Sequence, residues 1–183
     1  MDRRDFLQTL AIGTGILLFP ARWLSASVLE AGHEVSFRCL GNVNGPRFLD
    51  GRTENGSVGL APDLGKRFSG TKWHVFNGGG GHIVLKCMGS IEGNRWLDGR
   101  TQNGSVGLAP SSNRPFTGTR WQVVPLDANN PDIVGLKCLG EIPGPVWLDG
   151  RTGNGSFGLA KTTDPPFTGT KWEVKMYPVA FDY

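Results

Sequence analysis

The segment WLDGRTQNGSVGLA at residues 96–109 occurs in nearly the same form at two other places in the chain. The other copies are FLDGRTENGSVGLA at 48–61 and WLDGRTGNGSFGLA at 147–160. The sequence around them repeats with spacings of 48 and 51 residues, and the extra residues fall in a turn-like stretch at 127–132. A repeat of this length, with insertions only at its boundaries, indicates three copies of one supersecondary unit.

Each unit has the pattern of four short β-strands. In the first unit Val35, Phe37 and Cys39 alternate with polar residues, as expected of a strand with one buried face. A second strand begins at residue 48, and an Asn-Gly pair then favours a tight turn into a third strand. A fourth strand is predicted around residues 73–75, and the other two units repeat all four patterns.

The chain as a whole is predicted to be all-β. Beyond residue 32 no stretch carries apolar residues at helical spacing over two turns, and 28 glycines without a collagen period are typical of many turns. Twelve strands must hide their edges, and three units are too few for a propeller. We therefore expect a single barrel, closed with threefold pseudosymmetry.

The pattern LDG…NGSVGLAP…Phe-x-Gly-Thr-x-Trp resembles the ricin-B-type, actinohivin-like β-trefoil lectin family. The resemblance covers residues 33–177 and implies a β-trefoil with repeats at 33–81, 82–131 and 132–177, followed by a C-terminal tail at 178–183. It also implies carbohydrate binding, because the matching aspartate in that family accepts hydrogen bonds from sugar hydroxyls.

Polar residues of the repeated segment are the candidate ligand-binding residues. A carboxylate can accept hydrogen bonds from two neighbouring hydroxyls, and charge-assisted hydrogen bonds are strong. The aspartates could equally nucleate the hairpins as Asx-turn residues, and the arginines could either contact ligand or orient the aspartates. The aspartates and arginines are expected to face the surface, at hairpin tips on the rim of the barrel, whereas the asparagines are expected mainly in turns. The candidates are Asp50, Arg52, Asn55, Asp98, Arg100, Asn103, Asp149, Arg151 and Asn154.

The aromatic residue before each Leu-Asp pair is a further candidate. Phe48, Trp96 and Trp147 alternate with an inward leucine, so they should face outwards. They could pack on Pro62 and Pro110, replacing a disulfide of the resembled lectins, or they could stack on a ligand.

Two departures from the resembled family remove its usual sugar platform. Alanine stands where the family has an aromatic residue on the third strand, and glycine stands where it has a later asparagine. These positions are Ala61, Ala109 and Ala160, and Gly70, Gly118 and Gly169.

The other repeated apolar residues are expected in the core, where a buried tryptophan removes roughly 150–250 Å² from water. This set comprises Trp73, Trp121, Trp172, Phe68, Phe116, Phe167, Leu49, Leu97, Leu148, Leu60, Leu108 and Leu159. Cys39, Cys87 and Cys138 hold equivalent inward positions, and threefold symmetry cannot pair three thiols, so we expect small buried hydrophobic residues. One disulfide with a spare thiol is the alternative in an exported protein.

Composition and motifs argue against several other functions. Without residues 1–27 the chain carries 16 basic and 14 acidic residues and no basic stripe, so nucleic-acid binding is not predicted. No Ser/His/Asp set, Cys/His pair or metal-ligand spacing occurs, and His33, His74 and His82 share no repeat position. We therefore predict a monomer that is not an enzyme, has no cofactor or metal, and contacts no membrane beyond its N-terminal segment.

Residues 1–27 have the pattern of an export signal. Arg3 and Arg4 precede an uncharged run from Phe6 to Ala21, which at 16 residues is shorter than the roughly 20 needed to span a bilayer as a helix. The start Arg-Arg-Asp-Phe-Leu resembles the twin-arginine motif of bacterial signal peptides. This resemblance implies a periplasmic or secreted bacterial protein, while the cleavage point and an uncleaved anchor stay open.

A carbohydrate-binding module with up to three equivalent shallow sites is the function that these observations predict. Weak single sites would gain from multivalency, which can raise avidity by ~10²–10⁴. The alternative is a β-trefoil that binds or inhibits a protein partner through one loop that differs between the repeats. The candidate loops are Asp63–Arg67, Ser111–Arg114 and Thr162–Pro166.

Overall fold

Each repeat folds into four β-strands, as the alternating pattern predicted. The computed structural model describes residues 29–42, 44–150 and 157–178; the predicted export signal lies outside them. The strands are β1 (Glu34–Cys39), β2 (Phe48–Arg52), β3 (Ser57–Ala61) and β4 (Trp73–Gly79); β5 (His82–Cys87), β6 (Trp96–Arg100), β7 (Ser105–Ala109) and β8 (Trp121–Pro125); and β9 (Ile133–Cys138), β10 (Trp147–Asp149), β11 (Gly158–Ala160) and β12 (Trp172–Tyr177).

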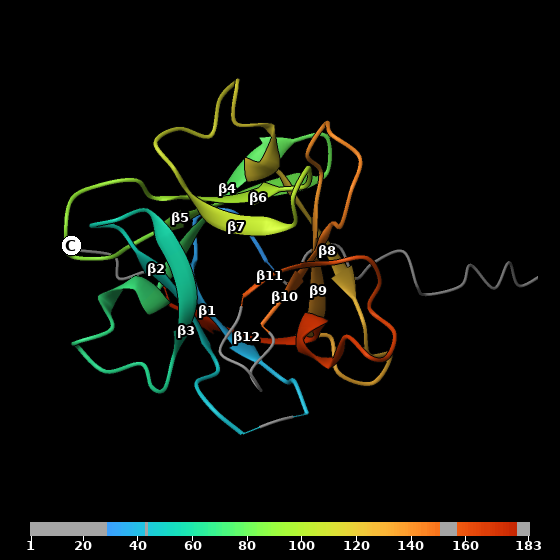
Figure 1. The fold of residues 1–183 in the computed structure, drawn as a ribbon. Helices are drawn as coiled ribbons and strands as arrows, with labels where there is room; N and C mark the ends of the chain where they lie inside the picture. Colours follow the sequence, from blue (N-terminus) through green and yellow to red (C-terminus); the bar gives the residue numbers. More distant parts are fainter. Residues whose placement is uncertain (1–28, 43, 151–156, 179–183) are drawn as a thin grey trace, which may run out of the picture.

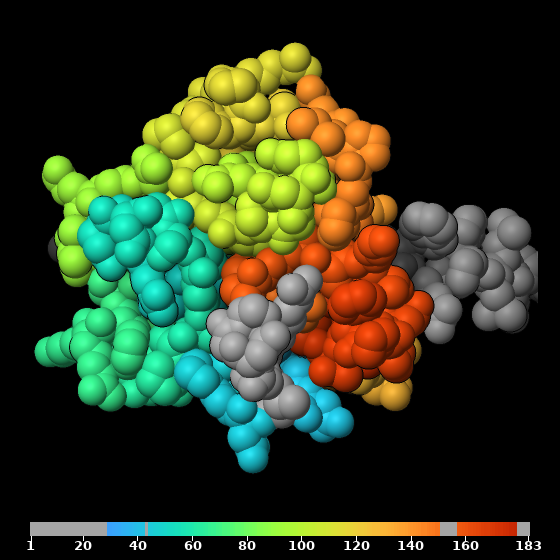
Figure 2. All heavy atoms as spheres, in the orientation of Figure 1, coloured from blue at the N-terminus to red at the C-terminus, as the bar shows by residue number. Residues whose placement is uncertain are grey.

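The first and fourth strands of the three repeats close into a barrel. Antiparallel pairing runs from β1 to β4, β5, β8, β9 and β12, and β12 returns to β1, so this ring has no free edge. The hairpins β2–β3, β6–β7 and β10–β11 lie around a common centre (Figure 1), and Figure 2 shows the repeats as three sectors of one face. This arrangement is a β-trefoil.

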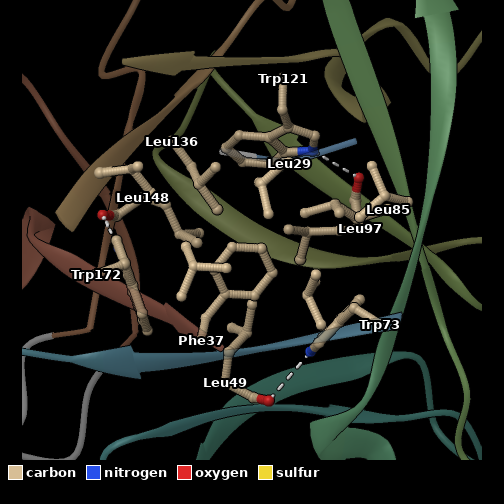
Figure 3. Packing of buried hydrophobic residues seen from close by; sticks show 14 of the residues in the cluster. Leu29, Phe37, Leu49, Trp73, Leu85, Leu97, Trp121, Leu136, Leu148 and Trp172 are labelled. Atoms are coloured by element: carbon tan, nitrogen blue, oxygen red, sulfur yellow. Dashed lines mark hydrogen bonds between the residues drawn. The ribbon is translucent and has the colours of Figure 1, made fainter. Parts of the chain in front are cut away.

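Three equivalent tryptophans tie the hairpins to the barrel. Trp73, Trp121 and Trp172 are fully buried, and each indole Nε1–H donates to the backbone carbonyl of a leucine on the second strand of its own repeat, at 3.0–3.1 Å (Figure 3). The acceptors are Leu49, Leu97 and Leu148. Leu29 is also buried at the centre of this core, so the packed domain begins before the predicted residue 33.

Part of the predicted core is only half buried. Leu60 packs against the edge of the core, and Phe68, Phe116 and Phe167 lie half exposed just before three short 3-10 turns. The turns are η2 (Ser69–Thr71), η3 (Thr117–Thr119) and η4 (Thr168–Thr170). Because these phenylalanines are half exposed, their assignment to the core was wrong. Each turn separates one of them from the buried tryptophan of its repeat.

The cysteines are free and buried, as expected, and they link neighbouring repeats. The Cys138 thiol donates to the carbonyls of Gly99 (3.3 Å) and Gly118 (3.4 Å) in the preceding repeat. Cys87 makes the equivalent bonds one repeat earlier, and Cys39 closes the circle by donating to the Gly169 carbonyl at 3.4 Å. The thiols therefore satisfy backbone acceptors at the repeat boundaries in addition to filling space.

Candidate functional site

The repeated aspartates lie on strands rather than at hairpin tips, and they are largely buried. Asp50 and Asp98 are 7 % exposed and Asp149 is 2 % exposed. Asp98 is the third residue of β6 and lies directly opposite Gly107 of β7, so its carboxylate sits beneath the hairpin surface. The expectation of surface-facing aspartates was therefore wrong.

An arginine covers each described aspartate of the first two repeats. The Nε atoms of Arg52 and Arg100 lie 3.9 and 3.7 Å from Oδ2 of Asp50 and Asp98, and about half of each arginine side chain is exposed. A Cβ placed on Gly107 would lie 3.2 Å from Nη2 of Arg100, so the glycine leaves room for the guanidinium. Arg151 lies outside the described residues.

The environment of these carboxyl groups shifts their titration. Burial raises the pKa of Asp50 and Asp98 above the ordinary value, and the neighbouring Arg52 and Arg100 partly oppose this shift. A desolvated carboxylate beside a cation costs folding free energy but is well suited to accept hydrogen bonds from a ligand.

A hollow of about 390 Å³ opens beside Asp98. Asp98, Arg100 and Thr117 contribute polar groups to its lining, whereas Phe116 and Ile142 contribute apolar surface. The sequence pattern predicts Phe116 in the core and carries no signal that brings Ile142 to this hollow. An aromatic face near a carboxylate is a feature that sugar sites share with other amphipathic pockets.

The third repeat supplies one wall of this hollow. The Thr101 hydroxyl donates to the carbonyl of Ile142, and the Thr117 hydroxyl accepts from the Glu141 amide at 3.3 Å. An ion pair of 2.7 Å between Arg114 Nη2 and Glu141 Oε1 joins the same two loops. The hollow therefore has walls from two repeats that are held together by both backbone and side chains.

The equivalent aromatic ring of the first repeat is covered. The guanidinium of Arg67 lies 5.1 Å from the centroid of the Phe68 ring, and Arg67 also pairs with Asp63 at 3.5 Å. Proline takes the place of Arg67 in the second repeat, at Pro115, and it leaves the Phe116 ring facing the hollow. The surroundings of Asp50 and Asp98 are therefore not equivalent.

The asparagines act as turn residues where they are described. Oδ1 of Asn55 accepts from the Ser57 amide at 2.9 Å, and Oδ1 of Asn103 accepts from the Ser105 amide at 3.0 Å. Asn154 lies outside the described residues.

The outward aromatic residues are half buried and lie away from the hollow beside Asp98. Trp96 contacts the Phe76 ring, with the ring centroids 5.4 Å apart, and Lys86 lies over its face. Trp147 has Lys137 over its ring, whereas Phe48 borders a separate groove on the barrel wall. In the first two repeats the structure thus brings together the aspartate and arginine of each candidate set, but not the outward aromatic ring.

No group of three His, Cys, Asp or Glu side chains in the described parts of the chain could hold a metal ion. Within these same residues no helix is long and apolar enough to cross a membrane.

Solved β-trefoil structures superpose on this chain at low sequence identity. The BEL β-trefoil has a TM-score of 0.58 and 18 % identity, covering 82 % of this chain and 97 % of that chain. The Macrolepiota procera ricin B-like lectin, solved in complex with lactose, has a TM-score of 0.54 and 18 % identity, covering 81 % and 98 %.

A domain of a larger enzyme also superposes. The GlcNAcα1-4Gal releasing endo-β-galactosidase from Clostridium perfringens has a TM-score of 0.59 and 16 % identity over 80 % of this chain, which spans only 33 % of that protein. Neither a protein-family model nor a curated protein sequence matches the chain. These similarities establish the β-trefoil fold and its likeness to a ricin B-like lectin.

Proposed function

We propose that this protein is an exported carbohydrate-binding module whose best-formed site is the hollow beside Asp98. The observation that carries the proposal is the combination of a buried carboxylate, a half-exposed guanidinium and a half-buried phenylalanine around one open space. A sugar presents the matching chemistry, because its hydroxyls pair with Asp98 and Arg100 while its apolar face packs on Phe116.

The energetic cost of Asp98 supports a binding role. A buried carboxylate with a raised pKa destabilises the fold at neutral pH, yet the chain carries this residue in all three repeats. The fold likeness to a lectin that was solved with lactose adds independent support for a carbohydrate ligand.

The number of working sites in this proposal is up to three, with unequal strength. The Asp98 site is the strongest because its aromatic wall is open, and the Asp50 site is weaker because Arg67 covers Phe68. Linked weak sites on one domain would raise avidity for a repeating glycan.

Asp98→Asn tests the site, with Asp50→Asn as its matched control. Asparagine preserves the size of the side chain but replaces one acceptor oxygen by a donor, so Asp98→Asn should lower affinity for the strongest ligand on a glycan array by at least tenfold, or roughly 1.4 kcal/mol. Asp50→Asn should change that affinity by less than threefold. Equal loss in both variants would contradict the unequal sites, and no loss in either would overturn the site.

A protein partner remains the rival ligand and predicts a different result. Replacing the Thr162–Pro166 loop with the sequence of Asp63–Arg67 should leave binding at the Asp98 site unchanged under the proposal, because no residue of the replaced loop lines that hollow. If the loop exchange abolished the function while Asp98→Asn did not, the protein-partner reading would replace the carbohydrate reading.

Export is proposed from the N-terminal segment, which lies outside the described residues. It depends on the basic and apolar pattern of the N-terminal segment. Replacing Arg3 and Arg4 by lysine should leave the protein in the cytoplasm of a bacterial host that has the twin-arginine pathway; unchanged export would exclude that route.

A further inference from the structure

A groove of about 620 Å³ lies on the barrel wall, where the third repeat meets the first. It runs over β12, β1 and β2 and is separate from the hollow beside Asp98, with which it shares no lining residue. Its lining includes Arg38, Phe48, Leu64, Glu173, Lys175 and Met176. Leu64 and Met176 are 37 % and 45 % exposed, so apolar surface is open to solvent here.

The other two repeat junctions fill the same place with their own side chains. At the junction of the first and second repeats, Trp96 and Phe76 replace Phe48 and Lys175, and their rings lie 5.4 Å apart. At the junction of the second and third repeats, a Cβ placed on Gly135 would lie 2.9 Å from the Trp147 ring, so the indole lies directly on the strand.

The groove therefore lies at the junction that has the smallest aromatic ring at the position shared by Phe48, Trp96 and Trp147. Phe48 is smaller than the tryptophans at its equivalent positions, and Lys175 stands where the other two junctions have Phe76 and Val124. Phenylalanine has less ring volume than tryptophan, and Lys175 brings no ring to meet Phe48, so the groove at this junction stays open.

Polar residues line the open groove where the filled junctions have less polar ones. Ser36 replaces Val84 or Gly135, Glu173 replaces His74 or Gln122, and the Ser36 hydroxyl lies 3.2 Å from the Tyr177 hydroxyl. Arg38 and Glu173 face each other across the strands at 3.2 Å and offer donors and acceptors at the rim. A ring that fits this place must thus combine an apolar face with polar edges.

We propose that this groove is a second carbohydrate site, which binds a pyranose ring stacked on Phe48 with its hydroxyls on Arg38, Glu173 and Lys175. A pyranose is close in size to the side-chain rings that occupy the other junctions, and it has the apolar face and polar edge that the lining requires. The volume corresponds to a small-ligand pocket rather than to a flat protein interface. This inference rests on the proposed carbohydrate function and adds a site on a different face of the protein.

The test fills the groove with the side chains that occupy the equivalent place at the junction of the first and second repeats. The double variant Phe48→Trp/Lys175→Phe installs the pair that packs at Trp96 and Phe76, so the fold should tolerate it. Val124→Phe places the same phenylalanine at the equivalent position of a junction already covered by Trp147 and is the matched control. Thermal unfolding of both variants verifies that they fold.

The probe is a printed array of defined oligosaccharides, followed by titration of the strongest-binding one. We expect Phe48→Trp/Lys175→Phe to weaken binding at least fivefold and Val124→Phe to leave it unchanged. Adding Phe48→Trp/Lys175→Phe to Asp98→Asn should remove the binding that persists in Asp98→Asn alone. Unchanged affinity in the groove-filled variant would overturn the second site while leaving the Asp98 site intact. Absence of any glycan binding by the wild-type protein would overturn both, and binding of a protein through the groove instead would overturn its carbohydrate assignment.

Discussion

Gly118 lies directly against Asp98: a Cβ added to Gly118 would come within 2.6 Å of the carboxylate Oδ1 and within 2.0 Å of the Gly99 carbonyl oxygen. The resembled lectins have an asparagine at the position of Gly118. Glycine is required here because the backbone of η3 packs directly against the strand that carries Asp98. This contact fixes the carboxylate from one side, while Arg100 covers it from the other.

Gly118→Ala should therefore damage both stability and binding. The added methyl group must displace backbone atoms, so we expect a loss of about 1–3 kcal/mol in the free energy of unfolding, measured by urea denaturation. Gly65→Ala is the control, because the atom nearest to its new Cβ belongs to the exposed end of the Asp63 side chain. Equal stability of the two variants would show that η3 can move away from β6.

The buried aspartates should make stability fall as pH rises. Since burial raises the pKa of Asp50 and Asp98 in the folded state, their contribution to stability is fully present below the pKa of the unfolded chain and is lost as pH rises through the raised folded values. The double variant Asp50→Asn/Asp98→Asn should therefore be more stable than wild type at pH 7, and the difference should shrink towards pH 3. Thermal melts across this range measure it, and a difference that grows on acidification would refute the assignment.

The indole hydrogen bonds should contribute equally in the three repeats. Trp121→Phe leaves the buried carbonyl of Leu97 without its donor, so the free energy of unfolding should fall by about 1–3 kcal/mol. Trp73→Phe and Trp172→Phe remove the equivalent bonds and should cost similar amounts in chemical denaturation. A much smaller cost in one repeat would show that its tryptophan acts mainly by packing.

The thiols should be unreactive in the folded protein. Burial raises the pKa of all three cysteines, that of Cys138 to about 11, so the reactive thiolate is scarce at neutral pH as well as inaccessible. A thiol reagent at pH 8 should modify none of them within minutes under native conditions and all three in denaturant. Rapid labelling of any cysteine under native conditions would contradict the burial of the thiols at the repeat boundaries.

The pattern of the sequence predicts the strands and the closed threefold fold because both follow from local alternation and an internal repeat. Leu49 and Trp73 were placed correctly for the same reason. The exposure of Asp98 was predicted wrongly because its closeness to an Asn-Gly turn in sequence obscured its position opposite Gly107 on a strand. Two repeated glycines were the available signal for this burial. Gly107 leaves space for Arg100, and Gly118 leaves space for Asp98.

The composition of the hollow could not be predicted from one repeat. Phe116 keeps the same sequence distance from its tryptophan as Phe68, yet whether each ring is open depends on the preceding residue, which is proline in one case and arginine in the other. Ile142 reaches the hollow from the next repeat through contacts with Thr101. The position of Ile142 arises from packing between repeats, and the cover over Phe68 arises from the conformation of the Arg67 side chain. The repeat pattern of the sequence reports neither.

The pairing of β1 with β12, in which Glu34 lies opposite Tyr177, has a consequence for how the chain can be cut and rejoined. A ring of strands has no inherent first member, so a circularly permuted chain that starts at His82 and joins residue 178 to residue 29 through a short linker would follow the same closed path. The new N- and C-termini would then lie at the glycine-rich bend at 78–81, between β4 and β5.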